Sequence, residues 1–189
     1  MRAFIAIELP AKIKDALIGI QHKLNTEKIR ISWVKPQNLH LTLKFLGDIS
    51  PEQLEKIKTT AKKIADNSGG FKVKLRKLGV FPNLRAGQII WVGTDEAPSS
   101  LKQLAQQLET GLAESGIPKE LRPFCAHITI GRIKNRPAAS DLQKALDRVK
   151  INTSDPGEFN CEKVILFEST LGPGGPVYTA LKELNLKIT

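Results

Sequence analysis

Apolar residues recur along the chain with two different periods, and the switches between them predict the secondary structure. Short apolar or alternating runs predict strands at residues 3–8, 31–34, 39–46, 71–81, 88–94, 124–133, 159–168 and 178–186. Four other stretches space their apolar residues three or four positions apart, as helices that bury one face do. Their stripes are Ile13/Leu17/Ile20/Leu24, Leu54/Ile57/Ala61/Ile64, Leu101/Leu104/Leu108/Leu112 and Leu142/Ala145/Leu146/Val149. Because several strands follow one another like hairpins, the pattern favours an α+β fold over a doubly wound parallel sheet.

The second of these helices has the clearest start. Ser50 is placed to be its N-cap, Pro51 falls at its first helical position, and Gln53 can complete a capping box with Ser50. We therefore expect the helix to begin directly after Ser50.

One four-residue pattern occurs twice, 87 residues apart. His40-Leu41-Thr42-Leu43 and His127-Ile128-Thr129-Ile130 both read His-aliphatic-Thr-aliphatic, and each lies in a predicted strand followed by a short turn and an amphipathic helix. The chain has only three histidines, and two of them fall in this pattern. The repetition predicts two similar halves with one motif in each, and the length of 189 residues fits either one globular domain or two small lobes that share a core.

Alternation along a strand predicts which of these side chains share a face. In the first strand His40, Thr42 and Lys44 should lie on the polar face, and Leu39, Leu41, Leu43 and Phe45 on the core face. In the second strand His127 and Thr129 should lie with Cys125, opposite Ala126, Ile128 and Ile130. If the halves pack with pseudo-two-fold symmetry, the two polar faces meet.

Two imidazoles on either side of a phosphate can act as a general acid–base pair. The hydroxyls of Thr42 and Thr129 can donate hydrogen bonds to the phosphate oxygens, and Lys44 can add positive charge. This chemistry needs neither a covalent nucleophile nor a cofactor. A zinc site made by Cys125, His127 and His40 is a weaker alternative because the spacing is not typical of metal ligands. Cys125 could also be a nucleophile, but no cysteine-histidine signature accompanies it.

Composition narrows the class of protein. The 189 residues include 29 Lys and Arg against 19 Asp and Glu, a formal net charge of +10. Such a charge fits either a generic basic surface or a polyanionic partner such as nucleic acid. The two cysteines predict free thiols in a reducing compartment, and no signal peptide or membrane-length apolar run is present. We expect a cytoplasmic protein.

An ordered set of motifs resembles the two-histidine phosphoesterase superfamily, and within it the RNA 2′,3′-cyclic phosphodiesterases, also called 2′-5′ RNA ligases. Besides the two H-x-T-x motifs, the resemblance includes several short segments spread over nearly the whole chain. These are residues 2–7, 33–34, 44–47, 81–83, 90–93, 122–124, Arg132, 168–169 and Tyr178.

The resemblance implies a single bilobal domain over residues 1–189, with an α+β fold and antiparallel-rich sheets around a central cleft. It implies hydrolysis of RNA 2′,3′-cyclic phosphate ends to 2′-phosphates without a metal or another cofactor, and reversible ATP-independent 2′-5′ joining. His40 then corresponds to the general acid and His127 to the general base. The implied partner is RNA with 2′,3′-cyclic or 2′-phosphate ends, tRNA halves among the candidates, and the protein is expected to be a monomer.

The remaining candidate contacts depend on the resemblance too. Arg132 is a candidate phosphate contact, although simple alternation places it opposite His127 unless a bulge intervenes. Arg85, Arg122 and Tyr178 are candidate contacts to the RNA end. Relatives usually have Pro-Arg where this chain has Gly87-Gln88, so Arg85 is the only cation of that loop.

Three alternative functions stay open: a tRNA-splicing-type ligase, a phosphodiesterase for small cyclic nucleotides, and a non-catalytic module that binds RNA ends. The last is disfavoured because a binding module does not need paired acid–base groups.

Overall fold

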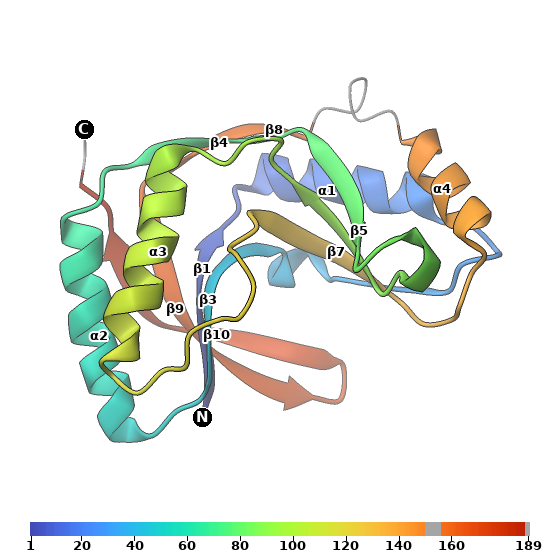
Figure 1. Ribbon diagram of the computed structural model, residues 1–189. Coiled ribbons are helices and arrows are strands. Elements are labelled where there is room, and N and C mark those ends of the chain that lie inside the picture. The colour runs from blue at the N-terminus through green and yellow to red at the C-terminus, as the bar shows by residue number, and fades with distance from the viewer. Residues whose placement is uncertain (150–155, 188–189) are drawn as a thin grey trace.

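The computed structural model describes residues 1–149 and 156–187, and its strands form one large and one small sheet (Figure 1). The large sheet runs β10-β9-β1-β3-β7-β6-β5, with β2 added beside β7, and every pair in it is antiparallel. Strands β4 and β8 form a separate antiparallel pair. The strands are β1 Arg2–Glu8, β2 Ile31–Trp33, β3 His40–Asp48, β4 Phe71–Leu75, β5 Lys77–Phe81, β6 Ile89–Gly93, β7 His127–Ile133, β8 Gly157–Cys161, β9 Lys163–Gly172 and β10 Gly175–Asn185. The predicted α+β class is confirmed.

Two pairs of helices pack on the sheets and complete the core. Helices α2 (Pro51–Asp66) and α3 (Ser99–Ala113) lie side by side, and α1 (Ala11–Leu24) contacts α4 (Ala139–Arg148) (Figure 1). Two short 3-10 helices, η1 (Pro36–Asn38) and η2 (Leu84–Ala86), occupy loops. Ser50 and Gln53 form the expected capping box at the start of α2. Among the described residues, no helix is both long and apolar enough to cross a membrane.

Three predicted strands differ from the observed ones because alternation does not reveal where a chain changes sheets. The run 71–81 breaks at Arg76, so that β4 pairs with β8 while β5 pairs with β6. The run 159–168 breaks at Glu162 between β8 and β9, and the run 124–133 becomes a strand only at His127. The expected turn at residues 152–157 lies largely outside the described residues.

The two halves of the large sheet meet at one place. Strands β3 and β7 pair antiparallel through the single residue pair Leu41 and Ile128, the central aliphatic residues of the two H-x-T-x motifs. Leu41 and Ile128 are both fully buried. The core therefore fixes the relative position of the two motifs.

Candidate active site

The pairing of Leu41 with Ile128 brings both motifs to one hollow. In an antiparallel pair the neighbours of an aligned couple also face each other, so His40 lies across from Thr129 and Thr42 across from His127. All four side chains line a hollow of about 280 Å³. The predicted meeting of the two polar faces is thus what the structure has.

Both imidazole rings are held in the same way. Nδ1 of His40 lies 2.7 Å from the carbonyl oxygen of Asn38, and Nδ1 of His127 lies 2.8 Å from that of Cys125. A carbonyl oxygen only accepts, so each Nδ1 carries the proton and donates. Nε2 of each ring has no hydrogen-bond partner among the described residues. Each Nε2 is therefore free to give or take a proton in the hollow.

The surroundings favour the neutral form of both rings. Burial lowers the pKa of His40 below its ordinary value of 6.5, the hydrogen bond to Asn38 opposes this, and the charge of His127 lowers it further. Burial likewise lowers the pKa of His127, against the hydrogen bond to Cys125. Aromatic rings pack around both histidines. The ring centres of Phe4 and Tyr178 lie 4.9 and 5.3 Å from that of His40, and the ring centre of Phe81 lies 5.0 Å from that of His127.

A β-bulge in each motif strand changes which later residues reach the hollow. In β3, Ile5 pairs with Lys44 and Ala6 with Thr42, so Leu43 is an extra residue. In β7, Ile90 pairs with Gly131 and Trp91 with Thr129, so Ile130 is the extra residue. A bulge reverses the alternation beyond it, so the residues five positions after each histidine, Phe45 and Arg132, line the hollow.

This reversal corrects the predicted place of Lys44 and Phe45. Lys44 is turned into the core, where its side chain is 1% exposed, and it is not a phosphate ligand. Its ammonium lies 2.8 Å from a carboxylate oxygen of Glu109 in α3 and donates to the carbonyl of Pro118 at 2.7 Å. Phe45, expected in the core, is 58% exposed at the hollow.

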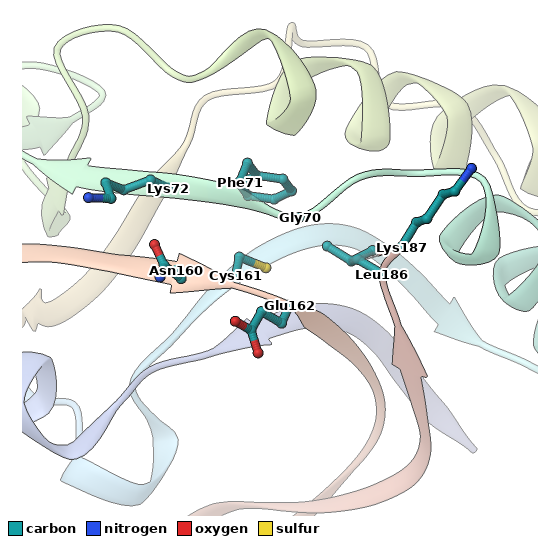
Figure 2. Close-up of a pocket in the computed structure, with 8 residues that line it drawn as sticks. All are labelled: Gly70, Phe71, Lys72, Asn160, Cys161, Glu162, Leu186 and Lys187. Carbon is teal, nitrogen blue, oxygen red and sulfur yellow. The ribbon is translucent and has the colours of Figure 1, made fainter. Parts of the chain in front are cut away.

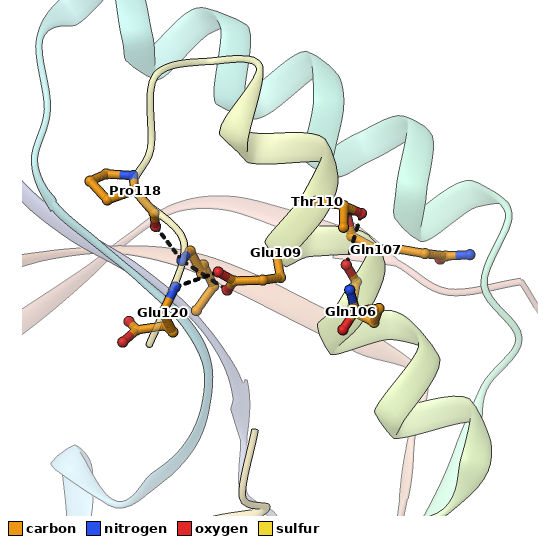
Figure 3. A network of polar contacts seen from close by, with 7 residues as sticks. Gln106, Gln107, Glu109, Thr110, Pro118 and Glu120 are labelled. Carbon is orange, nitrogen blue, oxygen red and sulfur yellow. Dashed lines mark hydrogen bonds and ion pairs between the residues drawn. The ribbon is translucent and has the colours of Figure 1, made fainter. Parts of the chain in front are cut away.

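Glu109 connects this buried lysine to the loop that leads into the second motif. Figure 3 shows the Glu109 carboxylate between α3 and this loop. The amide of Glu120 donates to Glu109 at 2.5 Å, next to the bond between Lys44 and Pro118. Lys44 and Glu109 thus hold the start of the segment that ends at His127.

Gln21 is a structural residue that the sequence reasoning missed. It is a buried polar residue of α1, and its Nε2 donates to the carbonyls of Val34 and Ile130, both at 2.9 Å. The carbonyl of Ile130 belongs to the bulge that turns Arg132 toward the hollow. Gln21 falls four residues after Leu17 and three before Leu24, on the buried stripe of the helix, and this position was the available signal.

The remaining candidate contacts divide into two groups. Tyr178 lines the hollow, and burial raises the pKa of its hydroxyl, which therefore stays protonated and can donate. Arg132 lines it as well. Arg85 and Arg122 do not: Arg85 lies in a neighbouring hollow beyond Arg132, and Arg122 in one beside α3.

The alternative chemistries receive no support from the described residues. No three His, Cys, Asp or Glu side chains there are grouped so that they could hold a metal ion. Burial raises the pKa of the Cys125 thiol, which disfavours the nucleophilic thiolate.

A separate hollow of about 330 Å³ contains the other cysteine, Cys161, beside the β4–β8 pair (Figure 2). Burial raises the pKa of this thiol to about 12, so it is unreactive at neutral pH.

Comparison with known proteins agrees with this geometry. Two halves that each bring a histidine and a threonine to a shared hollow are the arrangement expected of a two-histidine phosphoesterase. A family model described as LigT-like phosphoesterase matches the chain twice, at residues 7–91 and 92–178, with one H-x-T-x motif in each match. The chain belongs to the LigT-like phosphoesterase family.

Individual relatives match over almost the whole chain. The RNA 2′,3′-cyclic phosphodiesterase of Methanocaldococcus jannaschii is 34% identical over 184 residues, 97% of this chain and 99% of that protein. The enzyme of the same name from Aquifex aeolicus is 34% identical over 189 residues, 98% and 97% of the two chains. The structure of TT0787 from Thermus thermophilus matches with a TM-score of 0.80 at 30% identity, covering 98% of both chains. LigT of E. coli, solved with 3′-AMP, matches with a TM-score of 0.77 at 31% identity, covering 98% of this chain and 97% of that one.

Proposed function

We propose that residues 1–189 act as a single bilobal domain that hydrolyses the 2′,3′-cyclic phosphate ends of RNA to 2′-phosphomonoesters. The observation that carries this proposal is the matched pair of imidazoles, each with Nδ1 bound to a backbone carbonyl and Nε2 free in one hollow. Two relatives of nearly equal length that are named RNA 2′,3′-cyclic phosphodiesterases support the choice of substrate.

The proposed reaction is a single displacement at phosphorus. His127 takes a proton from water as the water oxygen bonds to phosphorus. The bond from phosphorus to the 3′-oxygen breaks, and His40 gives its proton to that oxygen. The phosphate stays on the 2′-oxygen. Proton exchange with solvent then returns His127 to its neutral form and His40 to its protonated form.

The residues around the two rings complete the assignment. The hydroxyls of Thr42 and Thr129 are placed to donate to the non-bridging oxygens, where negative charge grows in the transition state. Arg132 supplies a full positive charge on one side of the hollow, and Tyr178 a hydrogen-bond donor next to His40. No step requires a metal ion or a nucleotide cofactor.

The same two groups can also join RNA ends. An RNA 5′-hydroxyl that takes the place of water and attacks the cyclic phosphate from the His127 side expels the 3′-oxygen and forms a 2′-5′ linkage. In the reverse of this joining, the 3′-hydroxyl attacks the linkage, re-forms the cyclic phosphate and expels the 5′-oxygen, and the histidines exchange roles: His40 takes the proton of the 3′-hydroxyl and His127 gives one to the 5′-oxygen.

An assay of product ends tests the proposal. A short oligonucleotide with a 2′,3′-cyclic phosphate is incubated with the protein, and the product is mapped by phosphatase and nuclease digestion. We expect a 2′-phosphate, and a loss of rate on the order of 10²–10⁴ in His40→Ala and in His127→Ala, the usual contribution of one acid or base. A 3′-phosphate product would overturn the acid–base assignment. Near-normal turnover by either folded variant would overturn the paired mechanism.

A further inference from the structure

A row of exposed cations continues from the candidate active site along the chain after β7. Arg132 lines the hollow, and Lys134 and Arg136 follow it at alternate positions, each exposed, while Ile133 and Asn135 between them are half-buried. Strand β7 ends at Ile133, the chain bends at Asn135, and Lys134 and Arg136 on either side of the bend both line the neighbouring hollow. The chain therefore carries three positive charges from the candidate active site into the neighbouring hollow.

The neighbouring strand adds a fourth cation to this row. In the pairing of β2 with β7, Ser32 lies opposite Arg132, and the amide of Lys134 donates to the carbonyl of Arg30 at 2.8 Å. This register places Arg30 directly opposite Lys134, both exposed. Like charges at directly opposite positions repel and destabilise a sheet. An anion between them would relieve that repulsion.

The side chain of Asn135 links the segment after β7 to the segment before β2. Its Oδ1 accepts from the amide of Arg30 at 2.9 Å, and its Nδ2 donates to the carbonyl of Lys28 at 3.0 Å. The two backbones that carry Arg30 and the cations at 134 and 136 are therefore tied to each other, and the row is built on fixed backbone.

The surface here is hollowed and has cations but no acid. A hollow of about 530 Å³ is lined by Arg85 from η2, Gln88, Lys134 and Arg136, and none of its lining residues is an Asp or Glu. Among the described residues, no ion pair involves Arg30, Arg85, Lys134 or Arg136. By contrast, the hollow that contains Arg122 also contains Glu109 and Glu120.

We propose that Arg30, Arg85, Lys134 and Arg136, here called the exit strip, bind the phosphodiester backbone of the RNA strand that leads away from the reacting end. The inference rests on the proposed function: a cyclic phosphate occupies the 3′-end, so the rest of the strand leaves through the 5′-side. Contacts to phosphates fix the position of a strand without reading its bases. The exit strip therefore favours oligonucleotide ends over cyclic mononucleotides, irrespective of sequence.

The test compares kcat/KM for three substrates: a uridine 2′,3′-cyclic mononucleotide, a six-nucleotide oligouridine with the same end, and that oligonucleotide with uncharged methylphosphonate internal linkages. The exit-strip variant is Lys134→Gln/Arg136→Gln. The matched control is Lys56→Gln/Lys63→Gln, which removes two exposed charges of α2 that take part in no ion pair among the described residues.

We expect the wild type to prefer the charged oligonucleotide, and the exit-strip variant to lower the ratio of oligonucleotide to mononucleotide kcat/KM roughly 3- to 30-fold, the range for two exposed charge contacts. The control should leave that ratio within about 2-fold of the wild type, since its charges lie elsewhere. The magnitude of the slope of log kcat/KM against log salt should fall by about 1.4 for the charged oligonucleotide, because each phosphate contact to a single strand contributes about 0.7. The methylphosphonate oligonucleotide should behave like the mononucleotide.

The outcomes separate this inference from the proposed function. Turnover of all three substrates with an unchanged ratio in the exit-strip variant would refute the exit strip and leave the hydrolysis intact. An equal fall in the ratio in both double variants would also refute it, because net charge would then explain the effect. No turnover of any substrate by the wild type would refute the proposed function and the inference with it.

Discussion

Neutralising Glu109 tests whether the buried ion pair with Lys44 holds the two motif-bearing segments together. Glu109→Gln keeps the shape of the side chain but leaves the ammonium of Lys44, 1% exposed, with only uncharged oxygens beside it, such as the carbonyl of Pro118. A buried charge without its counter-charge is costly because the protein replaces little of the hydration that the charge has lost.

The magnitude follows from the burial of the two partners. Removing one partner of a fully buried pair costs about 3–5 kcal/mol. The Glu109 side chain is 21% exposed, so water can partly compensate. We therefore expect a loss of about 3 kcal/mol in the free energy of unfolding. This is a large share of the roughly 5–15 kcal/mol that stabilises a typical domain.

Urea unfolding at pH 7, followed by circular dichroism, measures this loss. Glu55→Gln is the matched control: it breaks an ion pair of the same 2.8 Å length with Lys58, but on the surface, where the expected cost is below about 1 kcal/mol. Lys44→Met/Glu109→Leu should recover most of the stability, because an apolar pair of similar size replaces the charges. If Glu109→Gln costs no more than Glu55→Gln, the buried pair does not stabilise the fold as argued.

Three further results are expected. The free energy of unfolding should rise from pH 5 to pH 7, because lowered histidine pKa values mean that the unfolded chain binds more protons below about 6.5 than the folded chain does. Urea unfolding measured at several pH values should show a flatter dependence in His40→Gln/His127→Gln. An unchanged dependence in that variant would assign the effect to other groups. Gln21→Leu should lower the free energy of unfolding by about 1–3 kcal/mol and should also lower kcat/KM, because the carbonyl of Ile130 in the bulge loses its hydrogen-bond donor. Gln103→Leu, at an exposed position, should change neither quantity. Cleavage and 2′-5′ joining should disappear together in each single histidine variant, and a variant that retains only one of them would separate the two activities.

The periods of the sequence predicted the helices, most strands and the two motifs because those features depend on residues close in the chain. The capping box at Ser50 and the alternation around His40 and His127 are of this local kind. The break at Arg76 was not predictable, since a strand that leaves one sheet for another keeps the same alternation on both sides. Partners on distant strands decide such changes.

The bulges show the same limit at the site itself. The extra residues Leu43 and Ile130 have no marker in the sequence, because each is an ordinary aliphatic residue in an ordinary alternating run. Simple alternation therefore placed Lys44 at the phosphate and Arg132 away from it, and both placements are reversed in the structure. The buried charge of Lys44 was visible in the sequence, but its partner Glu109 is 65 positions away and could not be identified before the fold was known.

The two bulges occupy equivalent positions but bring different residues to the hollow, Phe45 from β3 and Arg132 from β7. This difference matters because the proposed reaction gives the two similarly held histidines different roles. With Nδ1 of each ring committed to a carbonyl, each ring has one site that can gain or lose a proton, Nε2. Burial lowers the pKa of both rings, and the charge of His127 lowers that of His40 further, so the doubly protonated pair is disfavoured. Under the proposed function, a bound phosphate anion would favour a proton on one of the rings, because a nearby negative charge raises a histidine pKa. The bulges also make the two ends of the hollow different, because the register places the cation Arg132 toward the His40 end, where its charge acts on Tyr178, and the apolar Phe45 toward the His127 end.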